Sequence, residues 1–187
     1  MNFSLEIIAV VLNLIYLILL IRENILCWFF GIAGSLTSIY LFYTIGLYSE
    51  SILYVYYVII GAYGYKLWKR KETKKDGLKV QTISLKKHFL IIFSAIIVAL
   101  IVGYIFEKNT DATNPYLDAF TTIFSFIASF LEAKKIISSW IFWMVVNALT
   151  IILYLQQNLF IYLLLTVIYV VFSVIGYLQW KKKLKSY

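Results

Sequence analysis

The chain has 187 residues, of which 63% are hydrophobic and only 14% are charged, and its formal net charge is +8. A soluble domain of this length would carry far more charge, so the composition indicates an integral membrane protein. The basic residues lie in short runs beside apolar stretches and not in one patch, which argues against a nucleic-acid-binding protein.

Seven apolar stretches are close to the length of roughly 20 residues that a helix needs to cross a bilayer. In chain order they are Phe3 to Ile21, Cys27 to Ile45, Ser51 to Trp68, Phe89 to Phe106, Ala119 to Leu131, Trp140 to Leu155 and Phe160 to Trp180. We expect seven transmembrane helices in an all-α membrane protein, with the short fifth helix buried among the others. The first stretch is not a secretory signal, because no basic segment precedes it and no small-residue cleavage site follows it.

Residues 22–71 and 134–183 align without a gap at an offset of 112 positions, so that Trp28 falls on Trp140. Each copy then comprises three helices, and a linker helix between them returns the chain to the first side of the membrane. We therefore expect two parallel copies in a 3+1+3 arrangement. The predicted parts are a first three-helix repeat (1–71), a cytoplasmic basic connector (72–88), a linker helix with an outer loop (89–117), and a second repeat with a basic tail (118–187).

Loops rich in Lys and Arg stay on the cytoplasmic side of a membrane. Basic runs follow the third span, precede the fourth and end the chain, at residues 69–71, 86–87 and 181–183. The expected outer loops, around Gly46, at 109–115 and around Asn158, carry almost no basic residues. This pattern predicts an outside N-terminus and an inside C-terminus.

Polar and aromatic side chains within the spans are the candidates for substrate binding. Trp143 and Asn147 lie four residues apart on one helix face, and an amide buried in hydrocarbon needs a protein or water partner. In the fifth span, Asp118, Thr122, Ser125, Ser129 and Glu132 form one polar stripe. The predicted binding residues are Trp143, Asn147, Tyr57, Tyr169, Thr121, Thr122, Ser125, Ser35 and Tyr54.

Each of these features also has a structural interpretation. Hydroxyls in spans often bond to their own helix, and small residues often mediate helix packing. Four aromatic residues are expected near the inner membrane surface: Trp68, Trp180, Tyr65 and Tyr177. Gating and interfacial anchoring are the two alternative roles for them. The lone Cys27 and the absence of a ligand cluster predict no metal and no cofactor.

No ionisable side chain lies near the middle of a predicted span, which favours facilitated diffusion over ion-coupled pumping. The sequence contains no Walker-type phosphate loop and no nucleophile–base set, so we do not expect an enzyme. A membrane scaffold subunit without transport activity is the alternative from another class, but it does not explain a polar stripe and a buried amide.

The run Trp140 to Asn147 (WIFWMVVN) and the preceding Asp118 to Thr122 (DAFTT) resemble the PnuC family of bacterial vitamin transporters. The segments at residues 46–48, 63–68 and 176–180 share this resemblance. It implies a SWEET-like fold, a homotrimer in the bacterial inner membrane, and passive uptake of nicotinamide riboside. A cytoplasmic kinase would trap the product without a stable contact.

The resemblance leaves the vitamin open between nicotinamide riboside, thiamine and riboflavin, because Tyr54 stands where riboside carriers of the family often have glutamine. Trp143, Tyr57 and Tyr169 are the expected partners of a cationic ring. The hydroxyls and the Asn147 amide would bond the sugar. We expect a mononucleotide to be refused, because its phosphate needs Lys or Arg in the cavity.

Overall fold

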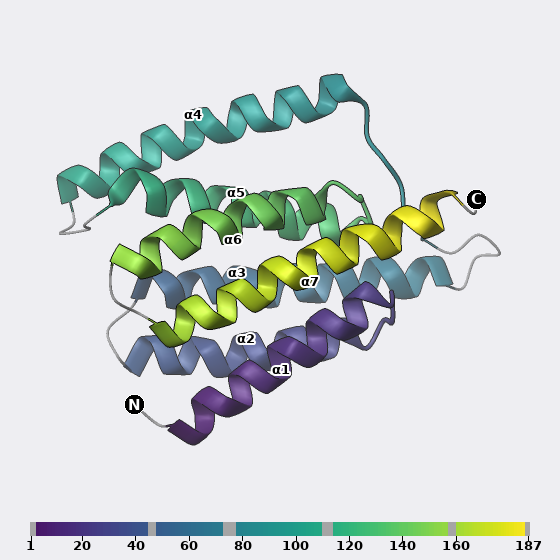
Figure 1. Cartoon of the computed structure of the whole chain (residues 1–187), viewed down its shortest axis with the longest axis horizontal. Helices are drawn as coiled ribbons and strands as arrows, with labels where there is room; N and C mark the ends of the chain where they lie inside the picture. The colour runs from purple at the N-terminus through teal and green to yellow at the C-terminus, as the bar shows by residue number, and fades with distance from the viewer. Residues whose placement is uncertain (1–2, 45–47, 73–77, 110–113, 157–159, 186–187) are drawn as a thin grey trace. The chain divides into compact units, whose positions relative to one another are not determined.

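The computed structural model describes residues 3–44, 48–72, 78–109, 114–156 and 160–185, and this part of the chain is helical apart from short turns and the segment 78–84. The helices are α1 (Phe3–Ile21), α2 (Cys27–Thr44), α3 (Tyr48–Glu72), α4 (Leu85–Asn109), α5 (Pro115–Ala133), α6 (Ser139–Gln156) and α7 (Phe160–Lys185) (Figure 1). Gly46, Asn158, most of the predicted 109–115 loop and residues 73–77 of the basic connector lie outside the described residues.

The seven predicted helices are all present, and the fifth begins at Pro115 instead of Ala119. Proline is favoured in the first turn of a helix, because its missing N–H would have no partner there. Four helical segments of the described chain are long and apolar enough to cross a membrane: α4, α5, α6 and Leu163–Lys185 of α7. Shorter apolar segments, Leu5–Ile21 and Cys27–Leu41, occupy α1 and α2.

The chain divides into two compact units. The first unit comprises Met1–Val80, Ala133–Lys135 and Gln179–Tyr187, and the second comprises Gln81–Glu132 and Ile136–Leu178. In the first unit, α2 packs against both α1 and α3 (Figure 1). In the second unit, α4, α5 and α6 share one hydrophobic core.

One tryptophan–glycine contact occurs at equivalent positions, 112 residues apart, in the two units. A Cβ atom on Gly64 of α3 would lie 2.5 Å from the Trp28 ring of α2, and one on Gly176 of α7 would lie 2.6 Å from the Trp140 ring of α6. Both indoles are fully buried. Only glycine permits this approach, so these two glycines serve helix packing.

The turns that precede α2 and α6 repeat each other at the level of single hydrogen bonds. The N–H of Asn24 bonds to the carbonyl five residues earlier at 2.9 Å, and the N–H of Ile136 does the same at 2.9 Å. Glu23 and Lys135, the residues just before them, have φ angles of 58° and 52°. Helix ends of this Schellman type normally place glycine at the left-handed position.

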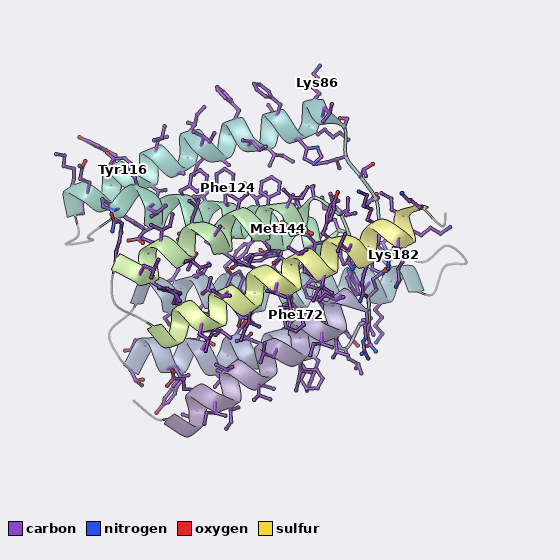
Figure 2. All side chains as sticks on the ribbon, in the orientation of Figure 1. Lys86, Tyr116, Phe124, Met144, Phe172 and Lys182 are labelled. Atoms are coloured by element: carbon purple, nitrogen blue, oxygen red, sulfur yellow. The ribbon has the colours of Figure 1, made fainter. Side chains whose placement is uncertain are left out.

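The core of the second unit is built where α4, α5 and α6 meet. Ala95 of α4 packs with Phe124 of α5 and Phe142 of α6, and Figure 2 labels Phe124. Near the other end of α4, Gly103 lies against the ring of Tyr116, the second residue of α5 (Figure 2). These small residues allow α4 to approach its neighbours closely at the two positions.

Candidate functional site

A buried carboxylate holds the ring of Trp143. The indole N–H of Trp143, in the second turn of α6, donates a hydrogen bond of 2.7 Å to Glu132 Oε2. Glu132 lies in the last turn of α5 and is 2% exposed. A buried bond of this length to a carboxyl oxygen restrains the orientation of the indole.

Asn147 lies one turn further along the same face of α6 and is also buried. Its Nδ2 donates to Ser173 Oγ of α7 at 3.5 Å, a long contact, while the Ser173 hydroxyl donates to the Tyr169 carbonyl at 2.7 Å. Glu132, Trp143, Asn147 and Ser173 are called the polar cluster below. It brings together an aromatic face, an amide, a hydroxyl and a carboxylate from three helices of the second unit.

Around Trp143, the two units place the large and the small side chain of an equivalent pair on opposite helices. In the first unit, Tyr16 of α1 covers Gly31 of α2, where an added Cβ would lie 2.8 Å from the tyrosine ring. At the equivalent positions of the second unit, α5 carries Ala128 and α6 carries Trp143, which packs against the cluster that contains Ala128. The large ring therefore comes from the opposite helix in each unit.

The same exchange occurs one turn away. In the first unit, a Cβ on Gly34 of α2 would lie 2.9 Å from Asn13 Oδ1 of α1. The equivalent residues in the second unit are Val146 on α6 and Ser125 on α5, and both are buried. α5 thus carries smaller side chains than α1 at these two positions, and α6 carries larger ones than α2.

The other predicted site residues of α5 make local contacts. The Thr121 hydroxyl donates to the carbonyls of Leu117 and Asp118, both at 3.0 Å. This is the bond to its own helix that is common for hydroxyls in membrane spans. Ser125 is buried and Thr122 is half-buried.

Three predicted binding residues lie in the first unit. Ser35 of α2 is buried. The rings of Tyr54 and Tyr57 on α3 meet edge to face with centroids 5.5 Å apart. The structure therefore places Trp143 and Asn147 on one face of α6, connects Asn147 to Ser173 of α7, and brings Tyr54 and Tyr57 together separately. The Ser173 hydroxyl reaches only the backbone carbonyl of Tyr169.

The four residues predicted as gate or interface differ in exposure. Trp68 and Trp180 are buried, Tyr177 is half-buried and Tyr65 is exposed. The Trp68 indole N–H donates to the Ala133 carbonyl at 2.9 Å. Lys69 Nζ lies 5.6 Å from the centre of the Tyr65 ring.

Trp68 borders an ion-pair cluster in the first unit, formed by Glu23, Lys135 and Lys183. Glu23 Oε2 lies 2.6 Å from Lys135 Nζ, and Oε1 lies 2.7 Å from Lys183 Nζ. Lys135 Nζ also lies 4.3 Å from the centre of the Trp68 ring. Burial alone would raise the pKa of Glu23, but the hydrogen bonds and charges of the two lysines outweigh it and hold this pKa below its ordinary value.

Sequence reasoning omitted Glu132 and Ser173 from the predicted site. Glu132 ends the predicted polar stripe of the fifth span, and this was the available signal. The bond from Trp143 of α6 to Glu132 could not be predicted, because the turn between α5 and α6 decides which residues of the two helices meet. Within the described ranges, no group of three His, Cys, Asp or Glu residues could hold a metal ion.

Comparison with known proteins yields one family and several relatives. A family profile described as nicotinamide mononucleotide transporter matches residues 4–182. A protein of Neisseria mucosa named nicotinamide riboside transporter PnuC is 25% identical over 191 residues, covering 96% of this chain and 73% of the relative. An Escherichia coli K12 protein of the same name is 21% identical over 164 residues, covering 74% of this chain and 68% of the relative.

The fold has a counterpart among solved structures. A crystal structure of the vitamin B3 transporter PnuC superposes with a TM-score of 0.82 and 24% sequence identity, covering 99% of this chain and 83% of the other. At this level of identity the likeness concerns the fold.

Proposed function

Because the chain belongs to the nicotinamide mononucleotide transporter family, we propose that this multi-pass membrane protein mediates passive uptake of nicotinamide riboside across the bacterial plasma membrane. The observation that carries the proposal is the pairing of Trp143 with Asn147 on one face of α6, next to the buried carboxylate of Glu132. The family is one of transporters and not of enzymes.

The polar cluster matches the chemistry of this substrate. Nicotinamide riboside is a flat cationic ring on a hydroxyl-rich sugar. An indole face attracts a cation by about 0.5 to 2 kcal/mol, and Trp143 supplies that face. Asn147 and Ser173 supply donors and acceptors for the carboxamide or the ribose hydroxyls.

The charge of the cluster favours the riboside over the mononucleotide. A phosphate group is recognised by Arg, Lys or backbone N–H groups. The polar cluster carries a carboxylate instead, and a buried carboxylate repels a phosphate. We therefore propose that the mononucleotide is not carried, although the family description names it.

Thiamine is the second candidate, and riboflavin the third. Thiamine is also a flat cation, so Trp143 suits it equally. Tyr54 and Tyr57 form an edge-to-face pair in the first unit and are further candidates for contact with a cationic ring. Direct competition between the vitamins separates these candidates.

We further propose seven transmembrane helices in two parallel three-helix repeats, assembled as a homotrimer, with the N-terminus outside. Transport then needs no ion gradient, and phosphorylation by a cytoplasmic kinase retains the product. The mass of the detergent-solubilised protein tests the trimer. Cysteine labelling from either side of the membrane at Arg22 and Lys108, which are both exposed, tests the orientation.

Uptake of labelled nicotinamide riboside into proteoliposomes without an ion gradient tests the function. We expect saturable uptake that the mononucleotide does not inhibit. Asn147→Ala and Trp143→Ala should each lower uptake at least tenfold. Ser94→Ala on α4, whose exposed hydroxyl bonds to its own helix, is the matched control and should transport normally.

Failure of both the riboside and thiamine to enter faster than into empty vesicles would contradict the proposed function. Normal uptake by Asn147→Ala and Trp143→Ala would instead contradict the proposed site.

A further inference from the structure

We propose that Glu132 is a positioning residue that fixes the indole of Trp143 and makes the site selective for a cationic cargo. The inference rests on the proposed function for the identity of the cargo, and on the geometry of two described residues for its mechanism. It assigns to the transport site a buried carboxylate that never contacts the substrate.

The first step is orientation. The Trp143 ring can rotate about two side-chain bonds, and either face or edge could meet a ligand. A buried bond of 2.7 Å from its N–H to Glu132 Oε2 selects one orientation. An indole N–H buried without an acceptor costs about 1 to 3 kcal/mol, so other orientations are disfavoured.

The second step is electrostatic. The face of an indole carries negative charge density, and cations bind there. A carboxylate that accepts the N–H bond pushes electron density into the ring and adds its own negative potential in a medium of low dielectric constant. Both effects strengthen attraction for a positively charged ring and leave a neutral ring of the same shape almost unaffected.

The repeat provides an internal comparison. The residues equivalent to Glu132 and Trp143 in the first unit are Leu20 and Gly31. Leu20 is fully buried, so a leucine is accepted at this place in the fold. The carboxylate and the tryptophan therefore occur together in one unit, and neither occurs at the equivalent place in the other.

Two variants separate hydrogen bonding from charge. Glu132→Gln keeps an acceptor for the indole N–H and removes the charge, while Glu132→Leu removes both. Glu107→Gln is the matched control, because Glu107 at the end of α4 is an exposed carboxylate that accepts a bond of 3.1 Å from Tyr116.

Calorimetry should compare the cationic nicotinamide riboside with its neutral 1,4-dihydro form, which has almost the same size. We expect the wild type to prefer the cation. Glu132→Gln should reduce that preference about three- to tenfold through loss of cation affinity alone, and Glu132→Leu should also weaken the neutral form. Equal preference in wild type and Glu132→Gln would overturn the charge-selection role.

A ligand-independent readout tests the positioning role. In protein labelled with 5-fluorotryptophan, the ¹⁹F resonance of residue 143 is identified by its loss in Trp143→Phe. We expect this resonance to shift and broaden in Glu132→Leu, to stay sharp in Glu132→Gln, and to be unchanged in Glu107→Gln. An unchanged resonance in Glu132→Leu would overturn the inference even if no vitamin binds the wild type, an outcome that would separately contradict the proposed function.

Discussion

Glu23 and Lys135 occupy equivalent positions of the internal repeat, 112 residues apart, and form an ion pair with each other at 2.6 Å. Both have left-handed backbone conformations. A non-glycine residue in this conformation costs about 1 kcal/mol or more. The ion pair offsets that cost, and it joins the turn before α2 to the turn before α6.

Removal of either partner should destabilise the protein. Breaking a buried ion pair leaves an uncompensated charge, so we expect Glu23→Gln and Lys135→Met each to lower the free energy of unfolding by about 3 kcal/mol. Lys183→Met should have an effect below about 1 kcal/mol, because its side chain is 43% exposed. Thermal unfolding in detergent measures all three, and equal effects of Lys135→Met and Lys183→Met would contradict this ranking.

The Glu23 carboxylate makes the stability of the protein depend on pH in the acid range. The folded-state pKa of Glu23 lies below the ordinary value of 4.5, so the stabilisation is fully present above that value and is lost as pH falls through the lowered folded-state pKa. We expect the melting temperature of the wild type to fall more steeply below pH 4.5 than that of Glu23→Gln. Parallel curves for the two proteins would show that the pair adds no acid-sensitive stability.

Alanine should be poorly tolerated at the two glycines beneath the buried tryptophans. Its Cβ would lie 2.5 Å from the Trp28 ring in Gly64→Ala and 2.6 Å from the Trp140 ring in Gly176→Ala. Overpacking of this kind costs about 1 to 3 kcal/mol. Unfolding measurements should also show Gly64→Ala with Trp28→Phe to be less destabilised than the sum of the single variants.

The opposite placement of large and small side chains around Trp143 predicts that a large residue at position 128 is tolerated only if residue 143 is small. Ala128→Tyr alone should overpack the second unit and lower its stability by about 1 to 3 kcal/mol. Adding Trp143→Gly should recover most of this stability, because the pair then matches Tyr16 and Gly31 of the first unit. Calorimetry on the double variant should nevertheless detect no riboside binding, and binding equal to wild type would exclude Trp143 from the site.

The helices could be predicted from the sequence because long apolar runs bounded by charge admit few alternatives. The first helix, Phe3 to Ile21, has the predicted bounds. The third extends beyond its apolar run to Glu72, because lysine and glutamate continue a helix as readily as leucine does. Hydropathy marks where a membrane span ends and not where a helix ends.

The candidate site was predictable only in part. The spacing of Trp143 and Asn147 follows from helix geometry, and so does the stripe that ends at Glu132. The bond between Glu132 and Trp143 does not, because it depends on the turn between α5 and α6. The ion pair between Glu23 and Lys135 could not be predicted from the sequence either. Their equivalent positions in the two repeats do not indicate that the two side chains are in contact.

The exchange of side-chain size has a consequence for how the gene can change. Recombination between the two halves would place a tyrosine at position 128 against Trp143, or an alanine at position 16 above Gly31. The first chimera is overfilled and the second leaves a void, so both should be less stable than the natural chain. The two members of each pair are therefore expected to change together.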